Sequence, residues 1–272
     1  MAGAAGVLLL SILILLPFRS DLMLRFEFPL QRLPFGKATH TWFAEQPDPA
    51  DAWGFAIYYQ AKSTGPVRGF AREQKHTKFI SLLGTEDDIF DQIGKNTKPK
   101  IKRALSEGGL RFSTIENPEE VRDLYNEFAR GKGRPPLDER TFRAYWPKML
   151  ATKISADGDA LVMHAFLVDE GLKRANHLYS ASLFRSTDDG DRRSLIGRAN
   201  RALHYLNMLS FKDRGIVTYD LGGYALGTQD PELQEVNEFK DSFGGQLVEE
   251  SNYVSLPLHW ARKISRLLRG RK

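Results

Sequence analysis

The spacing of apolar and polar positions predicts strands and helices over most of the chain. In the first third, the segments LRFEF, WGFAIYY and TKFISLL show strand-like patterns, and turn-forming residues separate them. From Leu110 onward the pattern predicts the order β, α, α, β, β, α, β, α, β. This order indicates an α/β fold of the α+β kind, built on a mixed sheet.

Capping residues mark where predicted helices begin. Thr85 is followed three residues later by Asp88, which gives the pattern of a capping box. Asn117 is followed by Pro118 and then by Glu120 in the same way. The helices predicted downstream cover residues 117–128, 138–150 and 194–215, and another begins at Asp230.

Composition narrows the classes of function. The chain has 272 residues, of which 42% are hydrophobic, and this is enough to bury one large core or two small ones. Because there is no cysteine, thiolate catalysis and Cys-ligated metals are excluded, and the six histidines lack metal-binding spacing, so we expect no metal site. A net charge of +5 and a pI of about 9.3 favour anionic partners.

Pattern and charge divide the chain into four segments. Residues 1–22 form an apolar N-terminal segment, which is either a membrane anchor or lies upstream of a true start at Met23. Residues 23–84 form a β-rich region, and residues 85–258 carry the predicted α/β domain. Residues 259–272 form a basic amphipathic tail.

The tail combines an apolar side with positive charge. Trp260, Ile264, Leu267 and Leu268 fall on one helical side, and the tail holds six Lys and Arg residues and no acid. This combination is typical of an interfacial helix on an anionic membrane. A basic C-terminus without that role has the same composition.

A combination of short motifs resembles a known family. The strand end YDLGG is followed by a helix that carries EFKDSFGG, and the segments NTKPKIKRALSEGGLRF and HLYSASLF precede them. Together these motifs are similar to the FemAB-like branch of the GNAT (acyl-CoA N-acyltransferase) superfamily. FemAB-like enzymes transfer an aminoacyl group from aminoacyl-tRNA to an amine of a peptidoglycan precursor, and wider GNAT relatives transfer acetyl from acetyl-CoA.

The resemblance covers about Thr77 to Pro257. It implies that residues 85–258 are a GNAT-like acyltransferase domain and that residues 23–84 are a short β-rich N-terminal extension. FemAB-type enzymes resemble two tandem GNAT units, and the region before Thr85 is too short for a complete first unit. Recognition of the acceptor, which the family spreads over both units, is therefore the least transferable property.

The resemblance assigns roles to residues around the FK pair, Phe239 and Lys240. Lys240 would lie beside the transferring acyl group and stabilise negative charge, whereas its spacing alone describes a surface lysine at the edge of an apolar stripe. Asp220 would orient the acceptor amine or act as a base, or would only cap a turn. The rest of this candidate site comes from the same strand end and comprises Tyr219, Gly222 and Gly223.

Candidate donor-binding residues lie on the preceding elements. By resemblance HLYSASLF is a strand splayed from its neighbour, where Ser180 and Ser182 would let a donor approach, although an ordinary buried strand has the same pattern. SLIGRA partly matches the Q/R-x-x-G-x-G/A loop that binds pyrophosphate at a helix N-terminus. The residues assigned to donor phosphates, some of which also suit a solvated helix face, are Lys102, Arg103, Arg192, Arg193, Gly197, Arg198 and Asn200.

These observations predict a FemAB-like acyltransferase that adds an aminoacyl or acyl group to an amine of a cell-envelope precursor, such as a peptidoglycan intermediate. The donor would be aminoacyl-tRNA or acetyl-CoA, with no permanently bound cofactor. One alternative is an acetyl-CoA-dependent N-acetyltransferase of an amino sugar in surface polysaccharide synthesis. Another is a non-catalytic tRNA- or membrane-binding protein. We expect a cytoplasmic location, with the tail at the inner face of the membrane.

Overall fold

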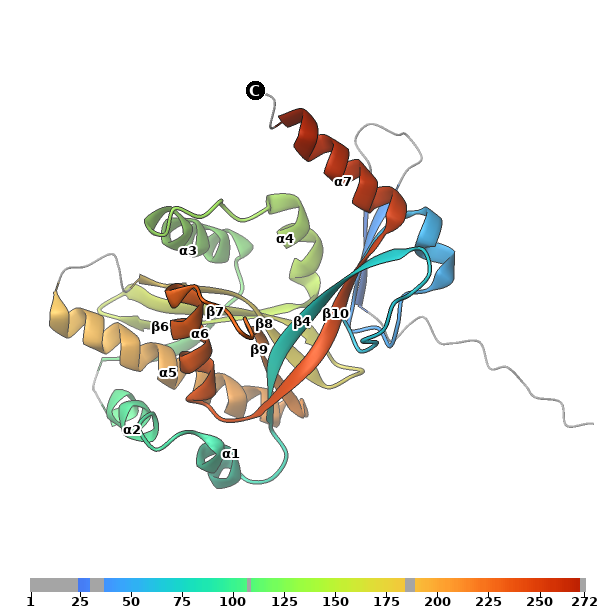
Figure 1. Cartoon of the computed structure of the whole chain (residues 1–272). Coiled ribbons are helices and arrows are strands. Elements are labelled where there is room, and N and C mark those ends of the chain that lie inside the picture. Colours follow the sequence, from blue (N-terminus) through green and yellow to red (C-terminus); the bar gives the residue numbers. More distant parts are fainter. Residues whose placement is uncertain (1–23, 30–36, 107–108, 184–188, 270–272) are drawn as a thin grey trace, which may run out of the picture.

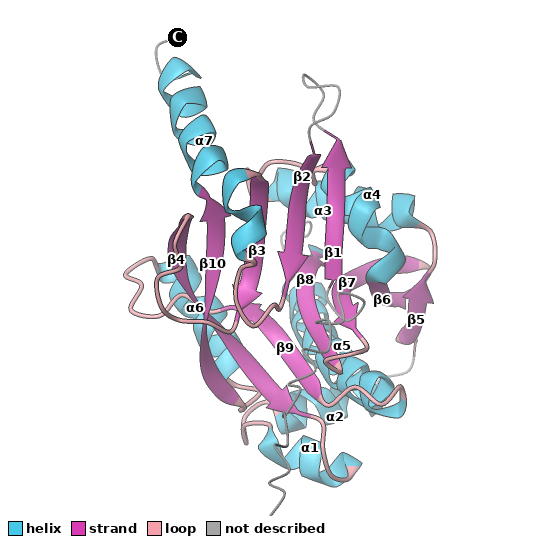
Figure 2. Ribbon diagram, turned by 90° about the vertical axis from the view of Figure 1, so that its right-hand side faces the viewer, coloured by secondary structure: helices cyan, strands magenta, loops and turns pink. Residues whose placement is uncertain are grey.

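A computed structural model describes residues 24–29, 37–106, 109–183 and 189–269. One ten-stranded mixed sheet forms the centre of the molecule (Figures 1 and 2). In spatial order its strands are β1 (Leu24–Pro29), β2 (Lys37–Trp42), β3 (Phe55–Ala61), β10 (Gln246–Ser255), β4 (Phe70–Ser81), β9 (Thr218–Gly223), β8 (Arg174–Ser182), β7 (Asp159–Asp169), β6 (Met149–Ala156) and β5 (Arg111–Ile115). This architecture confirms the predicted mixed α/β fold class.

Helices cover both faces of the larger half of the sheet. One face carries α1 (Glu86–Gln92), α2 (Lys98–Ser106), α5 (Gly190–Asp213) and α6 (Pro231–Asp241). The opposite face carries α3 (Pro118–Gly131) and α4 (Glu139–Tyr145), as Figure 1 shows. The last helix, α7 (Leu256–Arg269), projects from the end of β10, and two 3-10 turns are η2 (Pro49–Trp53) and η3 (Trp146–Lys148).

Two long strands connect the N-terminal region to the rest of the sheet. β4 and β10 pair antiparallel from Phe79↔Gln246 to Phe70↔Ser255, so they run along each other for their full shared length. β3 pairs with the far side of β10, and β9 pairs with the far side of β4. As a result the β-rich N-terminal region and the α/β region form one continuous sheet (Figure 2).

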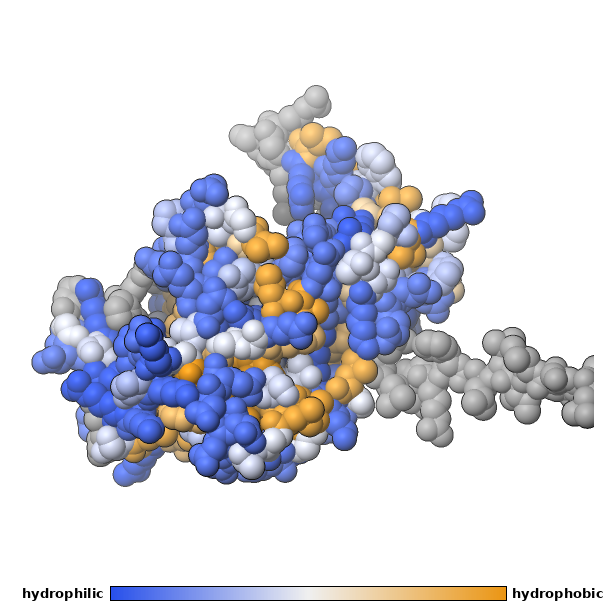
Figure 3. Space-filling view, turned by 60° about the horizontal axis from the view of Figure 1, so that its bottom comes forward, coloured by the Kyte–Doolittle hydropathy of each residue, from blue (hydrophilic) through white to orange (hydrophobic). Residues whose placement is uncertain are grey.

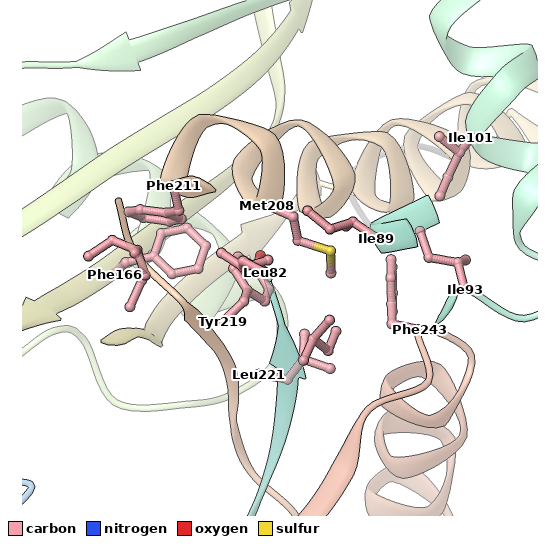
Figure 4. Packing of buried hydrophobic residues seen from close by; sticks show 13 residues of the cluster. Leu82, Ile89, Ile93, Ile101, Phe166, Met208, Phe211, Tyr219, Leu221 and Phe243 are labelled. Atoms are coloured by element: carbon pink, nitrogen blue, oxygen red, sulfur yellow. The ribbon is translucent and has the colours of Figure 1, made fainter. Parts of the chain in front are cut away.

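The largest apolar cluster lies between the sheet and the helices α1, α2, α5 and α6. Phe166, Phe211 and Tyr219 pack against one another, with ring centroids 4.9–6.1 Å apart. Ile89 and Phe243 close the same cluster from α1 and from the turn after α6 (Figure 4). Burying such side chains contributes about 1.5–3 kcal/mol each, so this cluster holds α6 and its lysine in a defined place.

Local predictions hold where capping chemistry decides the structure. Thr85 and Asp88 form both hydrogen bonds of a capping box, and Asn117 caps α3 with Pro118 in its first turn. The sequence pattern predicts neither β2 nor β6 as a strand. The alternation of polar and apolar residues does not reveal β6, because the polar residue Thr152 is fully buried in it. The sequence pattern also extends the preceding helix through Pro147 to Leu150, whereas α4 ends at Tyr145.

Within the described residues, no helix is both long enough and apolar enough to cross a membrane. The apolar segment 1–22 lies outside the described residues.

Candidate functional site

The sheet opens between β8 and β9. These parallel strands pair at only three positions, from Arg174↔Thr218 to Asn176↔Asp220. Beyond that point β8 stays with β7, and β9 stays with β4. The structure therefore has the splayed strand that the resemblance implies, and beyond Asn176 and Asp220 the backbones of β8 and β9 do not pair with each other.

Lys240 lies at this opening. It occupies the last turn of α6, and its Nζ donates hydrogen bonds to the carbonyl oxygens of Gly222, at 3.2 Å, and Gly223. Burial lowers the pKa of Lys240 to about 8, while the negative charge of Asp220 acts in the opposite direction. Near neutral pH this ammonium can therefore donate a hydrogen bond or give up a proton at small cost.

Gly222 and Gly223 differ in what they tolerate, and this gives a matched test. Gly222 has φ +72°, and a Cβ there would lie 2.7 Å from the carbonyl oxygen of His177, whereas a Cβ on Gly223 meets nothing within 4 Å. We expect Gly222→Ala to destabilise the fold by at least about 1–2 kcal/mol and Gly223→Ala by less than about 0.5 kcal/mol. Denaturant unfolding of both variants measures this. Equal effects would show that the His177 contact does not constrain the opening.

Asp220 lies directly behind the opening in a buried ion-pair network. Its carboxylate accepts hydrogen bonds from Arg174 at 2.5 and 3.1 Å and from Asn176 at 2.6 Å. Further donors to the same carboxylate are the Gln60 amide, the Thr77 hydroxyl and the backbone N–H of Gly222. Six hydrogen bonds occupy a fully buried group, so Asp220 holds the strand ends in place and has no lone pair left to accept a substrate proton.

The arginine in this network is held on all sides. Arg174 also donates to Glu250 at 2.7 and 2.9 Å, and its guanidinium lies 4.0 Å from the Phe43 ring centroid and 4.5 Å from that of Phe79. Burial opposes its charge, but Asp220 and Glu250 outweigh burial, and the pKa of Arg174 is raised. The network thus joins β8, β9 and β10 at the point where β8 and β9 begin to separate.

Three histidines lie on the α5 side of the opening. The ring centroids of His164, His177 and His204 are 4.2–5.0 Å apart. Burial lowers the pKa of all three, that of His164 to about 4, so these rings are neutral at physiological pH. The Nε2 atom of His177 is buried without a hydrogen-bond partner among the described residues, and no cluster within those residues has a geometry for metal.

A chain of hydrogen bonds orients Asn200. The Thr152 hydroxyl bonds the Asn207 side-chain oxygen at 2.8 Å, and the Asn207 amide lies 3.3 Å from His164 Nδ1. His164 Nε2 therefore carries the proton and donates to the Asn200 side-chain oxygen at 2.8 Å. Because that oxygen is occupied, Asn200 has its amide N–H groups left to donate. The Tyr219 hydroxyl lies 2.7 Å from Nδ1 of His204, inside the core.

A basic pocket lies beside α2 and α5. Its volume is about 440 Å³, and hydrophilic side chains dominate this side of the molecule (Figure 3). Its lining contains no acid and consists of Pro99, Lys100, Arg103, Arg193, Ser194, Gly197, Arg198 and Arg201. Of the residues predicted to bind donor phosphates, the structure brings Arg103, Arg193, Gly197 and Arg198 together here.

Two other predicted basic residues lie elsewhere. Lys102 has its ammonium 5.4 Å from the Phe90 ring centroid, and Arg192 pairs with Asp159 at 3.3 Å. Ser180 and Ser182 lie on the part of β8 beyond the last pair with β9. There they pair with His164 and Val162 of the neighbouring strand β7.

The prediction of a phosphate loop at SLIGRA is wrong. α5 begins at Gly190, where Asp189 caps it, so residues 194–199 lie inside the helix. Their backbone N–H groups bond within the helix and cannot hold a pyrophosphate. The hydrogen-bond donors that line this pocket are therefore positively charged side chains and not the N–H groups of a backbone loop.

Arg201 connects the pocket with the opening, and the sequence motifs do not indicate it. It lines the pocket, and its guanidinium lies 5.0 Å from the ring centroid of Phe239, which precedes Lys240. Its Nε atom is buried without a partner among the described residues, and burial lowers its pKa. Arg201 lies four residues after Gly197, so a helical projection of α5 would have placed it on the pocket side.

Comparison with solved structures confirms the fold that the motifs implied. It is similar to FemX, with a TM-score of 0.62 and 12% sequence identity, over 88% of this chain and 85% of that one. It is also similar to the C-terminal domain of a putative lysylphosphatidylglycerol synthetase from Agrobacterium fabrum, with a TM-score of 0.52 and 14% identity over 85% and 82% of the two chains. For L-PGS from Bacillus licheniformis the TM-score is 0.50 at 12% identity, over 82% and 75%.

Neither a comparison with protein-family models nor one with curated proteins finds a match in sequence. At the identities of the structural neighbours, the likeness concerns the fold.

Proposed function

We propose that this protein transfers an aminoacyl group from a phosphate-bearing donor to an amine of a cell-envelope component. The observation that carries the proposal is the connection between Lys240 and the basic pocket, which runs through Phe239 and Arg201. A donor with its phosphates at the pocket would extend its acyl end toward the opening between β8 and β9. The FemX and lysylphosphatidylglycerol synthetase folds support this class of reaction.

Aminoacyl transfer needs only a few catalytic side chains. The acceptor nitrogen attacks the carbonyl carbon of the donor ester, a C–N bond forms, the C–O bond to the donor breaks, and the amine proton passes to the leaving oxygen. Lys240, as an ammonium at the opening, would stabilise the oxyanion and relay this proton, because it gives its own proton to the leaving oxygen and takes up the one from the amine. The amide N–H groups of Asn200 would donate to a carbonyl oxygen, and Asp220 would act through Arg174 as a positioning residue.

Two acyl donors carry the phosphate groups that this basic pocket would bind. Aminoacyl-tRNA and acetyl-CoA both present phosphates to arginine and lysine. Because the SLIGRA segment lies within α5, the backbone loop that favoured acetyl-CoA is absent from the described residues, and we favour aminoacyl-tRNA. That donor also makes the cytoplasm the proposed location, with a peptidoglycan intermediate or another envelope amine as acceptor.

Charge reversal in the pocket tests the donor site. Arg103→Glu is expected to weaken donor binding about tenfold or more, because a charged hydrogen bond contributes about 1.5–3 kcal/mol. Lys95→Glu, on the same basic run but outside the pocket lining, is the matched control and is expected to bind as the wild type does once salt is raised.

The measurement is calorimetric titration with acetyl-CoA, followed by an assay with charged tRNA. Binding of acetyl-CoA that Arg103→Glu weakens would transfer the proposal to an acetyl-CoA-dependent N-acetyltransferase of an amino sugar. Failure of both donors to bind or react would leave a non-catalytic binding protein as the better description.

A further inference from the structure

The final helix presents its apolar side to solvent. Leu256, Trp260, Ile264 and Leu267 repeat at helical spacing along α7, and their exposed fractions run from 40% to 65%. On the other side of the helix, the positive charge of Arg262 acts on the side chain of Tyr59 on β3. A surface helix normally directs its apolar stripe toward the protein core, and α7 does the reverse.

A second exposed aromatic residue lies on a neighbouring element. Trp53 ends η2, which packs against the start of α7, and 89% of its surface is exposed. Tryptophan is costly to leave in water at this exposure, and it is enriched where a protein meets a lipid headgroup layer. Two tryptophans from different elements therefore mark the same end of the molecule.

Positive charge accompanies this apolar surface. Along α7 the charged residues are Arg262, Lys263, Arg266 and Arg269, with no acid, and the Lys263 ammonium lies 5.0 Å from the Trp260 ring centroid. A second copy of the chain would bring two such helices face to face, and their like charges would repel. Nucleic acid would satisfy the charges but would leave the apolar stripe in water. An anionic bilayer satisfies both.

We propose that α7 and Trp53 form a docking surface for an anionic lipid bilayer. The helix lies in the plane of the membrane, with Trp260, Ile264 and Leu267 inserted at the boundary between headgroups and acyl chains, and Lys263 and Arg266 contact lipid phosphates. In Figures 1 and 2, α7 leaves the opposite end of the molecule from α1 and α2. A docked molecule thus keeps the basic pocket beside α2 accessible from the aqueous side.

Vesicle binding by the full chain tests this surface. Sedimentation is measured with vesicles of phosphatidylcholine alone and with added phosphatidylglycerol, for the wild type and for Ile264→Asp and Trp260→Ala. We expect binding to the anionic vesicles, a blue shift of tryptophan emission, and about tenfold weaker partitioning for each variant. Leu83→Asp removes an equally exposed apolar residue at another end of the molecule and is expected to bind as the wild type does.

Several results would overturn the proposal. Equal binding of the wild type and Ile264→Asp would show that α7 does not carry the contact, and so would absence of binding to the anionic vesicles. A wild-type dimer that Ile264→Asp dissociates would assign the surface to a second copy, and tRNA binding lost in Arg266→Ala without vesicle binding would assign it to nucleic acid. Unchanged melting of the variants confirms that they fold. Because vesicle binding needs no turnover, failure here would leave the proposed acyl transfer standing.

Discussion

Lys240→Met is expected to abolish acyl transfer and to remove a pH dependence of stability. The methionine keeps the apolar stem but cannot donate to the carbonyls of Gly222 and Gly223 or stabilise an oxyanion at the opening. If the cationic form of Lys240 is the active one, wild-type turnover falls as the pH rises above about 8. Any residual turnover of the variant should not depend on pH in this way, because the variant has no ammonium group at position 240.

The stability effect of this lysine has a definite direction. Its pKa is lower in the folded protein, at about 8, than the ordinary value of 10.5, so the unfolded chain binds more protons between these two pH values. The free energy of unfolding of the wild type, relative to Lys240→Met, should therefore rise by about 3 kcal/mol between pH 8 and pH 10.5. Below pH 8 the difference between the two proteins is constant.

Paired denaturant unfolding of wild type and variant across this pH range measures the difference. Lys62→Met, which removes an exposed lysine paired with Glu45, serves as the matched control and should show no such trend. A flat difference for Lys240→Met would mean that the ammonium is not desolvated in the folded protein. Full turnover by Lys240→Met would remove the catalytic role.

Asp220→Ala is expected to lower the free energy of unfolding by about 3–5 kcal/mol. The substitution breaks the buried ion pair between Arg174 and Asp220 and leaves the Arg174 Nε without its acceptor, and removing one partner of a buried pair costs far more than the intact pair contributes. It also strands the amide groups of Gln60 and Asn176. A loss of this size would unfold a marginally stable domain at moderate temperature.

Two adjacent glutamates on β10 provide the matched comparison. Glu250 bonds Arg174 in the core, while Glu249 bonds Arg72 at the surface, and the exposed fraction of its side chain is 37%. Glu250→Ala should resemble Asp220→Ala, and Glu249→Ala should cost less than about 1 kcal/mol. Thermal and denaturant unfolding of the three variants tests this. Similar small losses in all three would show that the network neither holds the strand ends nor constrains the opening.

Both predictions concern the same few ångströms of structure. The buried network fixes where β8 and β9 stop pairing, and Lys240 occupies the carbonyls at the end of β9. Activity should therefore fall in Asp220→Ala through loss of geometry, even in molecules that remain folded. In Lys240→Met the geometry stays and the charge is lost, so the two variants separate positioning from chemistry.

Features that depend on neighbouring residues can be predicted from the sequence alone. The capping pairs at Thr85 and Asn117 form as their spacing predicts, and the motif around Phe239 and Lys240 indicates the fold. Gly244 in that motif has φ +76°, a left-handed backbone conformation that favours glycine. Such residues can be recognised in the sequence because the local structure that requires them is formed by residues only a few positions away.

Only the tertiary structure decided which groups meet. A basic run along the chain does not reveal that Arg103 lines the pocket while Lys102 lies over Phe90, because one helical step directs them differently. The sequence predicts Asp220 as a possible base at a strand end, but five of its six hydrogen bonds come from the strands β3, β4 and β8, which are distant in the sequence. The burial that lowers the pKa of Lys240 likewise depends on α6 closing over the opening. The surroundings of these side chains are set by contacts between residues far apart in the sequence. The spacing of residues along the chain therefore does not predict them.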